Sequence, residues 1–311
     1  MFKIININKP QGFTSNDVVQ KIKHSLKLKK EKIGHLGTLD PFATGVLPIT
    51  LGKATRLFDF YLNKDKEYIV QVLFGFETNT LDIDGEVTQK SNNIPSAQQI
   101  ETALLGMLGK QMQMPPAYSA KKVNGKRAYE LARQNKEVVL EPKQIEIIDL
   151  KLLQENANCE EQLCKIRQKF DKNISISQIF NIKIACSSGT YVRAFVRDLA
   201  KKLGTVATCT SLTRTKAGEF EIANAVGLEE FLIAPETHFL NFEDVLKSVA
   251  RHEIGEYILT DFLNGKPIKT GIKSKDPFFI TYNKKVVALC ESQDGLLKTK
   301  TFLYDKEENK W

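Results

Sequence analysis

The sequence contains no uninterrupted run of about 18 apolar residues, the length that a membrane-spanning helix requires. Its first residues, Met1 to Asn6, lack the apolar segment of a secretory signal peptide. The five cysteines form an odd number and include no CxxC pair, so neither a disulfide framework nor a zinc ribbon is indicated. We therefore expect a cytoplasmic protein with reduced thiols and no membrane association.

Motifs for nucleotides and metals are also missing. Gly45 and the pair Gly52-Lys53 are separated by six residues instead of the four of a P-loop, and Ala54 stands where a magnesium-binding Ser or Thr belongs. No GxGxxG follows a predicted strand, and no His, Cys and Asp cluster has the spacing of metal ligands. We expect neither a cofactor nor a catalytic metal.

Positive charge is in excess. The 311 residues carry 45 Lys and Arg against 37 Asp and Glu, a net charge of +8 that favours a polyanionic partner such as nucleic acid. Six lysines with a single acid, Glu31, fall between positions 21 and 32, where they form either a track for phosphates or an ordinary solvated helix face. They are Lys21, Lys23, Lys27, Lys29, Lys30 and Lys32.

The hydrophobic pattern predicts an α+β protein. Helices are expected after Thr14 or Ser15, from the capping box of Ser96 and Gln99 to Gly109, and from about 190 to 203. Period-two alternation predicts strands at 68–74, 145–153 and 179–186, and the weakly patterned stretch 154–177 reads as an insertion or a long hairpin. The elements interleave without regular βαβ spacing, which argues against a doubly wound sheet.

The composition shifts after Ala225. Two short helices, 228–233 and 242–249, precede short strands between 257 and 304 that are separated by turn residues, a pattern typical of a small β-barrel. At about 150 residues per domain the chain is long enough for two domains. We predict one domain over residues 1–240 and a second, smaller domain over residues 241–311.

One segment is rich in polar and ionisable side chains. Residues 34–49 hold His35, Thr38, Asp40 and Thr44 among three glycines and two prolines, so they form a structured loop and not a regular element. Considered alone, Asp40 reads as a turn aspartate, and His35 as a surface or core histidine.

Two further blocks are unusual. Residues 115–129 combine two tyrosines with four cations, as stacking platforms for single-stranded nucleic acid do, although a basic surface loop has the same composition. Arg193 falls in the first turn of its predicted helix, where its charge opposes the helix macrodipole. An arginine in that place favours an anionic partner.

Together these blocks resemble the TruB-type tRNA pseudouridine-55 synthase family, in order and spacing from about Ile5 to Phe220. The resemblance implies that uridine in the T-loop of tRNA is isomerised, its base being detached, turned and rejoined through carbon without a cofactor. It also implies a pseudouridine-synthase fold with a central, largely antiparallel mixed sheet and a small C-terminal PUA-like β-barrel that binds RNA. The matching segments are residues 34–41, 43–48, 66–68, 114–120, 189–193 and 212–214.

The resemblance assigns catalytic roles to individual residues. Asp40 matches the family's catalytic aspartate, and Arg193 matches the arginine that pairs with it. Tyr68 matches the tyrosine that stacks on the flipped uracil and is proposed to help remove its C5 proton, while Leu212 matches the apolar residue on the other face. His35 matches the histidine that fills the stack vacated by the base.

RNA contacts are implied as well. Residues 115–136 correspond to the family's RNA-gripping insertion, which places Tyr118 among the candidate RNA contacts, and Tyr191 is a further candidate. If six lysines neutralise phosphates, affinity should fall with a log-log salt slope of about −5. These lysines are Lys9, Lys21, Lys23, Lys29, Lys30 and Lys122. We expect a monomer acting on the T-arm; a tRNA-folding chaperone and an isomerase guided by a ribonucleoprotein partner remain alternatives.

Overall fold

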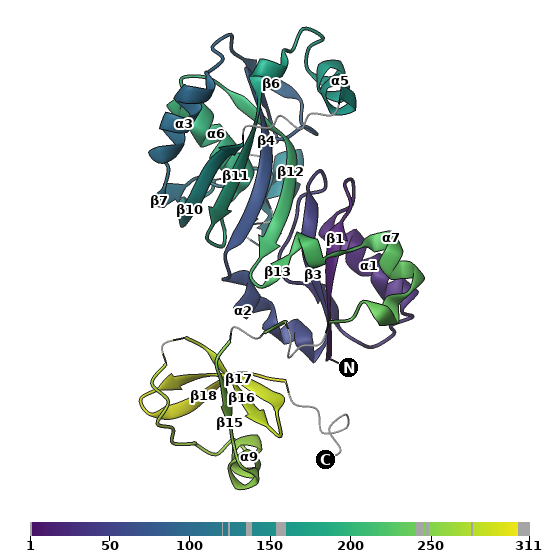
Figure 1. Cartoon of the computed structure of the whole chain (residues 1–311), viewed down its shortest axis with the longest axis vertical. Helices are drawn as coiled ribbons and strands as arrows, with labels where there is room; N and C mark the ends of the chain where they lie inside the picture. Colours follow the sequence, from purple (N-terminus) through teal and green to yellow (C-terminus); the bar gives the residue numbers. More distant parts are fainter. Residues whose placement is uncertain are drawn as a thin grey trace.

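The computed structural model describes residues 2–119, 121–123, 125–134, 139–153, 160–240, 245–246, 249–274 and 276–303. Figure 1 shows a large sheet with helices in the upper part of the molecule and a separate small sheet in the lower part. This arrangement confirms the predicted α+β class. Within the described ranges, no helix combines the length and the apolar character needed to cross a membrane.

The main sheet contains ten strands, with the order β14-β1-β3-β12-β4-β11-β10-β7, while β13 pairs with β12 and β2 with β3. Its pairs are antiparallel except β1 with β14 and β3 with β12, as the predicted mixed, largely antiparallel sheet requires. The strands are β1 (Phe2–Lys9), β2 (Ile33–His35), β3 (Thr44–Gly52), β4 (Lys66–Phe74), β7 (Gly109–Gln113), β10 (Lys143–Leu153), β11 (Ile179–Cys186), β12 (Ala207–Ala217), β13 (Phe220–Glu221) and β14 (Val226–Gly227).

Two halves of this sheet meet at β3 and β12. Only two residue pairs connect these strands, Thr44 with Thr213 and Gly45 with Arg214, and the two threonine hydroxyls hydrogen-bond at 2.9 Å. Gly45 has a φ of +102°, and a Cβ there would overlap the backbone of Arg214. Glycine is therefore required where the two halves approach each other.

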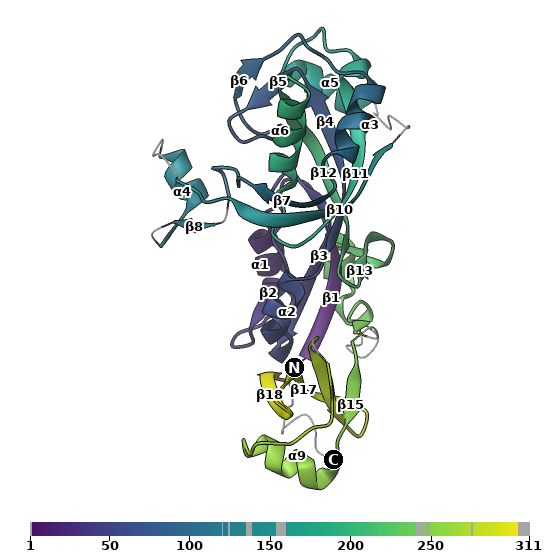
Figure 2. The ribbon, with the colours of Figure 1, turned by 90° about the vertical axis from the view of Figure 1, so that its left-hand side faces the viewer.

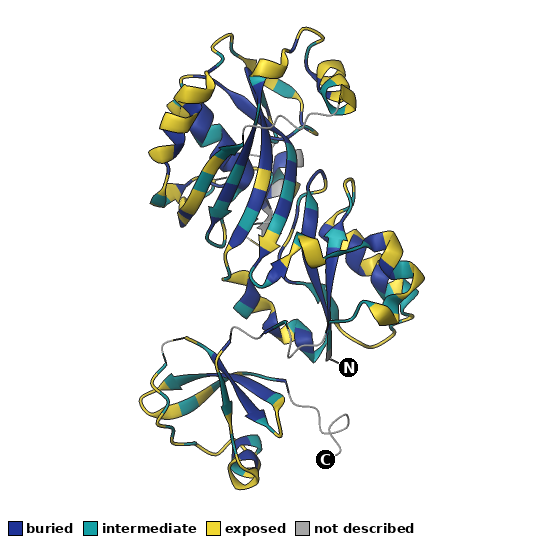
Figure 3. Cartoon of the chain, in the orientation of Figure 1, coloured by how far each residue is buried: buried dark blue, intermediate teal, exposed yellow. Residues whose placement is uncertain are grey.

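Amphipathic helices cover the main sheet. The hydroxyl of Thr14 caps α1 (Ser15–Ser25), and the predicted capping box of Ser96 and Gln99 begins α3 (Ala97–Leu105). That helix ends at Gly106, before the predicted end at Gly109, because the chain turns into β7. Figure 3 shows buried positions on the sheet and exposed positions on the outer faces of the helices. The remaining helices here are α2 (Phe58–Leu62), α6 (Val192–Lys202), α7 (Leu228–Ile233), η1 (Lys53–Leu57), η3 (Ile222–Asn224) and η4 (Pro235–Thr237).

Two segments extend from the main sheet. The predicted insertion carries the hairpin of β8 (Lys122–Val123) and β9 (Lys126–Arg127) followed by α4 (Ala128–Arg133), which project sideways in Figure 2. The described part of the stretch predicted as an insertion or a long hairpin contains α5 (Glu160–Lys169) and η2 (Ile176–Gln178). Ile166 of α5 packs in a cluster with Phe76, close to the hairpin of β5 (Phe76–Thr78) and β6 (Val87–Lys90).

The small sheet has four strands in the order β15-β16-β17-β18. Residues predicted to begin its strands form α9 (Glu256–Leu263) instead, whose Leu259 and Phe262 face the sheet's own core. Most of the predicted helix 242–249 lies outside the described residues. The strands are β15 (Arg251–Glu253), β16 (Phe278–Tyr282), β17 (Lys285–Gln293) and β18 (Leu296–Phe302).

The small sheet shares a second core with the main one. Phe279 and Leu289 belong to the same buried cluster as Ile4 and Leu57. In addition, the guanidinium of Arg56 donates a 2.8 Å hydrogen bond to the carbonyl of Phe302. The C-terminal sheet is therefore packed against the end of the main sheet and is not merely tethered to it.

Candidate active site

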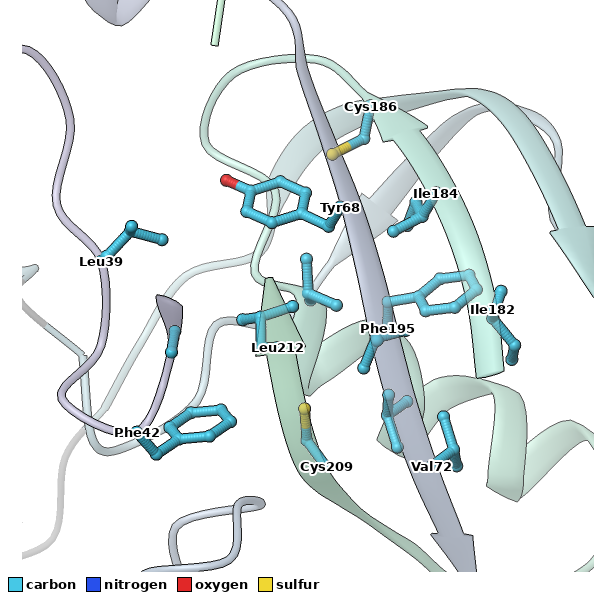
Figure 4. Close-up of a cluster of buried hydrophobic side chains, with 14 of the residues drawn as sticks. Leu39, Phe42, Tyr68, Val72, Ile182, Ile184, Cys186, Phe195, Cys209 and Leu212 are labelled. Atoms are coloured by element: carbon cyan, nitrogen blue, oxygen red, sulfur yellow. The ribbon is translucent and has the colours of Figure 1, made fainter. Parts of the chain in front are cut away.

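The loop that carries Asp40 is fixed on both sides by buried residues. Leu39 and Phe42 are 4% and 3% exposed and enter the main core, as Figure 4 shows beside β12 and β4. The hydroxyl of Ser15 accepts a hydrogen bond from the Leu39 N–H at 2.8 Å and donates one to the Leu39 carbonyl at 3.1 Å. The Ala43 N–H closes a turn onto the Asp40 carbonyl at 3.1 Å. These contacts leave the carboxylate of Asp40 little freedom.

Arg193 binds Asp40 with a parallel pair of hydrogen bonds. Its Nε donates to Oδ2 at 2.8 Å and its Nη2 donates to Oδ1 at 3.0 Å, the bidentate geometry for which a guanidinium is suited. The arginine side chain is 5% exposed, whereas that of Asp40 is 34% exposed, so the carboxylate still faces solvent. The position of Arg193 in the first turn of α6 predicted an anionic partner, and the family resemblance implied that this partner is Asp40.

A second carboxylate, Asp82, shares the same arginine. Its Oδ2 lies 3.3 Å from Nη1 of Arg193, and Thr80 donates to its Oδ1 at 2.6 Å. Burial raises the pKa of Asp82, and the charge of Arg193 opposes that rise. The sequence analysis missed this residue; its only signal was the acidic turn Asp82-Ile83-Asp84-Gly85 after β5.

The remaining donors of Arg193 bind backbone carbonyls. Nη1 donates to the Thr80 carbonyl and Nη2 to that of Tyr118, at 2.8 and 2.9 Å. Together with the carboxylates of Asp40 and Asp82, these carbonyls provide a partner for each of the three nitrogens of the guanidinium. The pKa of Arg193 is raised despite its burial because two carboxylates surround it.

Tyr68 and Leu212 come from neighbouring strands. Tyr68 of β4 is 8% exposed, and Leu212 of β12, which pairs with Val70 of β4, is 5% exposed. In Figure 4 the Tyr68 hydroxyl points toward the loop of Leu39, with Leu212 below the ring. Burial raises the pKa of the Tyr68 hydroxyl, and the charge of Arg214 opposes this.

His35 and Lys9 flank the same loop at different depths. His35 ends β2, is half-buried, and accepts a hydrogen bond at Nδ1 from the Gly37 N–H at 3.4 Å. Lys9 is fully buried, and its Nζ donates to the carbonyls of Phe13 and Pro41 at 2.7 and 3.3 Å. This placement does not fit the phosphate contact expected for Lys9. Burial lowers the pKa of Lys9 to about 8.

The predicted RNA contacts lie near the base of the projecting segment. Tyr118 is half-buried, and its carbonyl accepts a bond from Arg193. Tyr191 caps α6, and the side chain of Gln113 both accepts from its N–H at 2.9 Å and donates to its carbonyl at 3.2 Å. Lys122 lies on β8, but its side chain is outside the described residues.

Another buried cation, Arg214, stands between the two sheet halves. In the sequence this residue only ended one of the segments that match the family, and no role was implied for it. It is 1% exposed, and its guanidinium donates to three carbonyls of the segment around Asp40. The site thus contains two carboxylates and two guanidiniums.

No group of three or more His, Cys, Asp or Glu side chains arranged to hold a metal ion occurs in the described ranges. A groove of about 860 Å³ is lined by residues of α3, β4, β10 and β12 and contains none of the predicted site residues. Its lining includes Ile69, whose side chain points away from the face of β4 that carries Tyr68. Asp40 and Arg193 therefore mark a separate site on the other side of the sheet.

Comparison with known proteins identifies the family. A family model described as TruB family pseudouridylate synthase, N-terminal domain, matches residues 23–192. The chain belongs to this family. The tRNA pseudouridine synthase B of Solibacter usitatus is 42% identical over 228 residues, which cover 73% of this chain and 70% of the relative. That of Bacillus cytotoxicus is 35% identical over 320 residues, 99% of each chain.

Solved structures agree on the fold. A chain from the crystal structure of a Cbf5-Nop10-Gar1 complex matches with a TM-score of 0.70 at 22% identity, covering 98% of this chain and 86% of that one. A chain from the structure of an H/ACA RNP bound to a substrate RNA containing 2'-deoxyuridine matches with a TM-score of 0.69 at 20% identity and the same coverage. The resemblance inferred from the motifs and the predicted fold are both confirmed, and the protein is a pseudouridine synthase.

Proposed function

We propose that the protein isomerises uridine to pseudouridine at position 55 in the T-loop of tRNA, with Asp40 as the catalytic carboxylate. The tRNA substrate is inferred from the relatives named tRNA pseudouridine synthase B, at 35–42% identity over most of the chain. The observation that carries the catalytic assignment is the bidentate pair of Arg193 and Asp40, at 2.8 and 3.0 Å. It holds one partly exposed carboxylate in a fixed direction.

The reaction needs a negative group beside the sugar. When the bond between C1′ and N1 breaks, its electron pair leaves with the uracil, and C1′ gains positive character that a carboxylate stabilises. The base then turns, a bond forms between C1′ and C5, the C5 proton leaves to solvent, and N1, which has lost its bond to the sugar, takes up a proton. No atom is gained or lost. Tyr68 and Leu212 supply flat and apolar walls between which a detached uracil can turn.

RNA binding is assigned to the parts of the chain that extend beyond this site. In this proposal residues 1–240 form the catalytic domain, and residues 115–136 and the PUA-like domain of residues 241–311 grip the tRNA T-arm. Lys29 and Lys30, both exposed at the end of the α1 region, contribute charge for phosphates. The protein acts as a monomer in the cytoplasm.

Tritium release from tRNA labelled at uridine C5 tests the catalytic role. The variant Asp40→Asn should release no tritium in a single-turnover assay, while its Kd for tRNA stays within about tenfold of wild type. Asp59→Asn, which removes an exposed carboxylate on α2, is the matched control and should keep the wild-type rate. Release that persists in Asp40→Asn would remove Asp40 from the mechanism.

The same variant also separates catalysis from a tRNA-folding role. A strain that lacks the protein is complemented with Asp40→Asn, and its tRNA is mapped for pseudouridine. Loss of the modification at position 55 is expected. Full rescue of growth by the inactive variant would instead favour the chaperone hypothesis.

A further inference from the structure

Arg214 occupies the joint between the two halves of the main sheet. Across β12 and β3 its backbone is paired with Gly45, and across β12 and β4 it is paired with Tyr68. The first pairing is one of only two that connect the halves. Arg214 is therefore, with Thr213, one of two residues of β12 that lie between the strand following the Asp40 loop and the strand carrying Tyr68.

Its side chain reaches both ends of the Asp40 loop. Nη2 donates to the Gly37 carbonyl at 3.0 Å and Nη1 to the Thr38 carbonyl at 3.3 Å, both on the side that precedes Asp40. Nε donates to the Val46 carbonyl at 2.8 Å, on the side that follows. A single planar group thus joins the two ends of a loop whose centre is the carboxylate.

The charge of Arg214 also fits the site. The hydrogen bonds of Arg214 go to neutral carbonyl oxygens, so its charge acts on neighbouring groups of the site, where it opposes the rise that burial causes in the pKa of Tyr68. The same charge repels a neighbouring ammonium: after burial itself, Arg214 is the main influence that lowers the pKa of Lys66 to about 8. A buried cation is costly to dehydrate, which makes a purely space-filling role for an arginine here a poor explanation.

We infer that Arg214 is a positioning residue that fixes the Asp40 loop to β12 and so sets the direction of the catalytic carboxylate toward the substrate. This inference rests on the proposed function. Three carbonyls bound through three different nitrogens of one side chain require the planar fork of a guanidinium, because the ammonium of a lysine carries the same charge as a point on a flexible stem. Charge alone is therefore insufficient at this position.

The test compares Arg214→Lys and Arg214→Gln in full-length protein, with Arg56→Lys as the matched control. Arg56 also donates to one carbonyl, that of Phe302, but lies at the contact with the small sheet. Losing one or two charged hydrogen bonds should slow single-turnover tritium release roughly tenfold in the lysine variant and about a hundredfold in the glutamine variant. The Kd for tRNA should stay within about threefold, and Arg56→Lys should match wild type in both.

Amide hydrogen exchange separates positioning from general stability. The amides of residues 37–46 should exchange faster in both Arg214 variants, while those of β4 keep their wild-type protection. Unchanged rates, unchanged exchange in the loop, or unfolding of both variants at the assay temperature would each overturn the inference, the last because Arg214 would then be a core residue. If wild-type protein forms no pseudouridine, the proposed function fails instead.

Discussion

Replacing Arg193 by lysine is the sharpest test of the site, because the change keeps the charge and removes only the geometry. Arg193 donates two hydrogen bonds to Asp40 and one each to the carbonyls of Thr80 and Tyr118. A lysine ammonium has no planar pair of donors, so it can replace one bond to Asp40 but not the parallel pair.

The magnitude follows from the lost bond. A hydrogen bond to a charged group contributes about 1.5–3 kcal/mol, and removing one from the transition-state geometry slows the reaction roughly 10- to 150-fold. The positive charge between Asp40 and Asp82 remains, so the variant should fold. A neutral Arg193→Met variant should in contrast lose about 3–5 kcal/mol of unfolding free energy, because two carboxylates would stand without their cation.

The assay is single-turnover tritium release at saturating protein, with thermal melting and tRNA binding measured in parallel. Arg197→Lys is the matched control: one turn further along α6, Arg197 donates to the Met114 carbonyl and pairs with Asp198. Its rate should stay within about threefold of wild type. A folded Arg193→Lys protein with the wild-type rate would refute the reasoning, since bidentate alignment of Asp40 would then be irrelevant to catalysis.

Two further outcomes follow from burial. Burial gives Asp82 a folded-state pKa above its unfolded value, so its contribution to stability is present below the unfolded pKa and lost as the pH rises through the folded pKa. At pH 7 Asp82→Asn should therefore melt no lower than wild type, yet it should react roughly tenfold slower because Arg193 loses an ion-pair partner. The exposed Asp84→Asn is the control. A clear fall in the melting temperature of Asp82→Asn would contradict this prediction. In a Cys159→Ser protein at pH 8, a thiol reagent should label Cys164 rapidly and reach the other three described cysteines only after denaturation; rapid labelling of more than one thiol would contradict their burial.

Local signals in the sequence predicted the elements that depend on near neighbours. The hydroxyl of Thr14, the capping box of Ser96 and Gln99 and the alternation along 68–74 each act over a few residues, and the structure has these features. The weak pattern of 154–177 concealed α5, whose one fully buried side chain, Ile166, gives little periodic signal.

The candidate site could be described only from the sequence and the tertiary structure together. The resemblance to the family, carried by motif order along the chain, implied Asp40, Arg193, Tyr68 and Leu212 as site residues, whereas helix position alone indicated only an anionic partner for Arg193. The sequence did not reveal that Asp82 shares Arg193, because none of the segments that carried the resemblance includes Asp82.

Burial and pairing across the sheet were decided by the tertiary structure alone. Lysine is usually a surface residue, yet the joint between β1 and the Asp40 loop encloses Lys9 completely, and a shared strand pairing places Arg214 between Gly45 and Tyr68. The sequence by itself determined which residues are candidates for the chemistry. The folded sheet determined which charged groups lie next to those residues, because electrostatic energy depends on distance in space and not on separation along the chain.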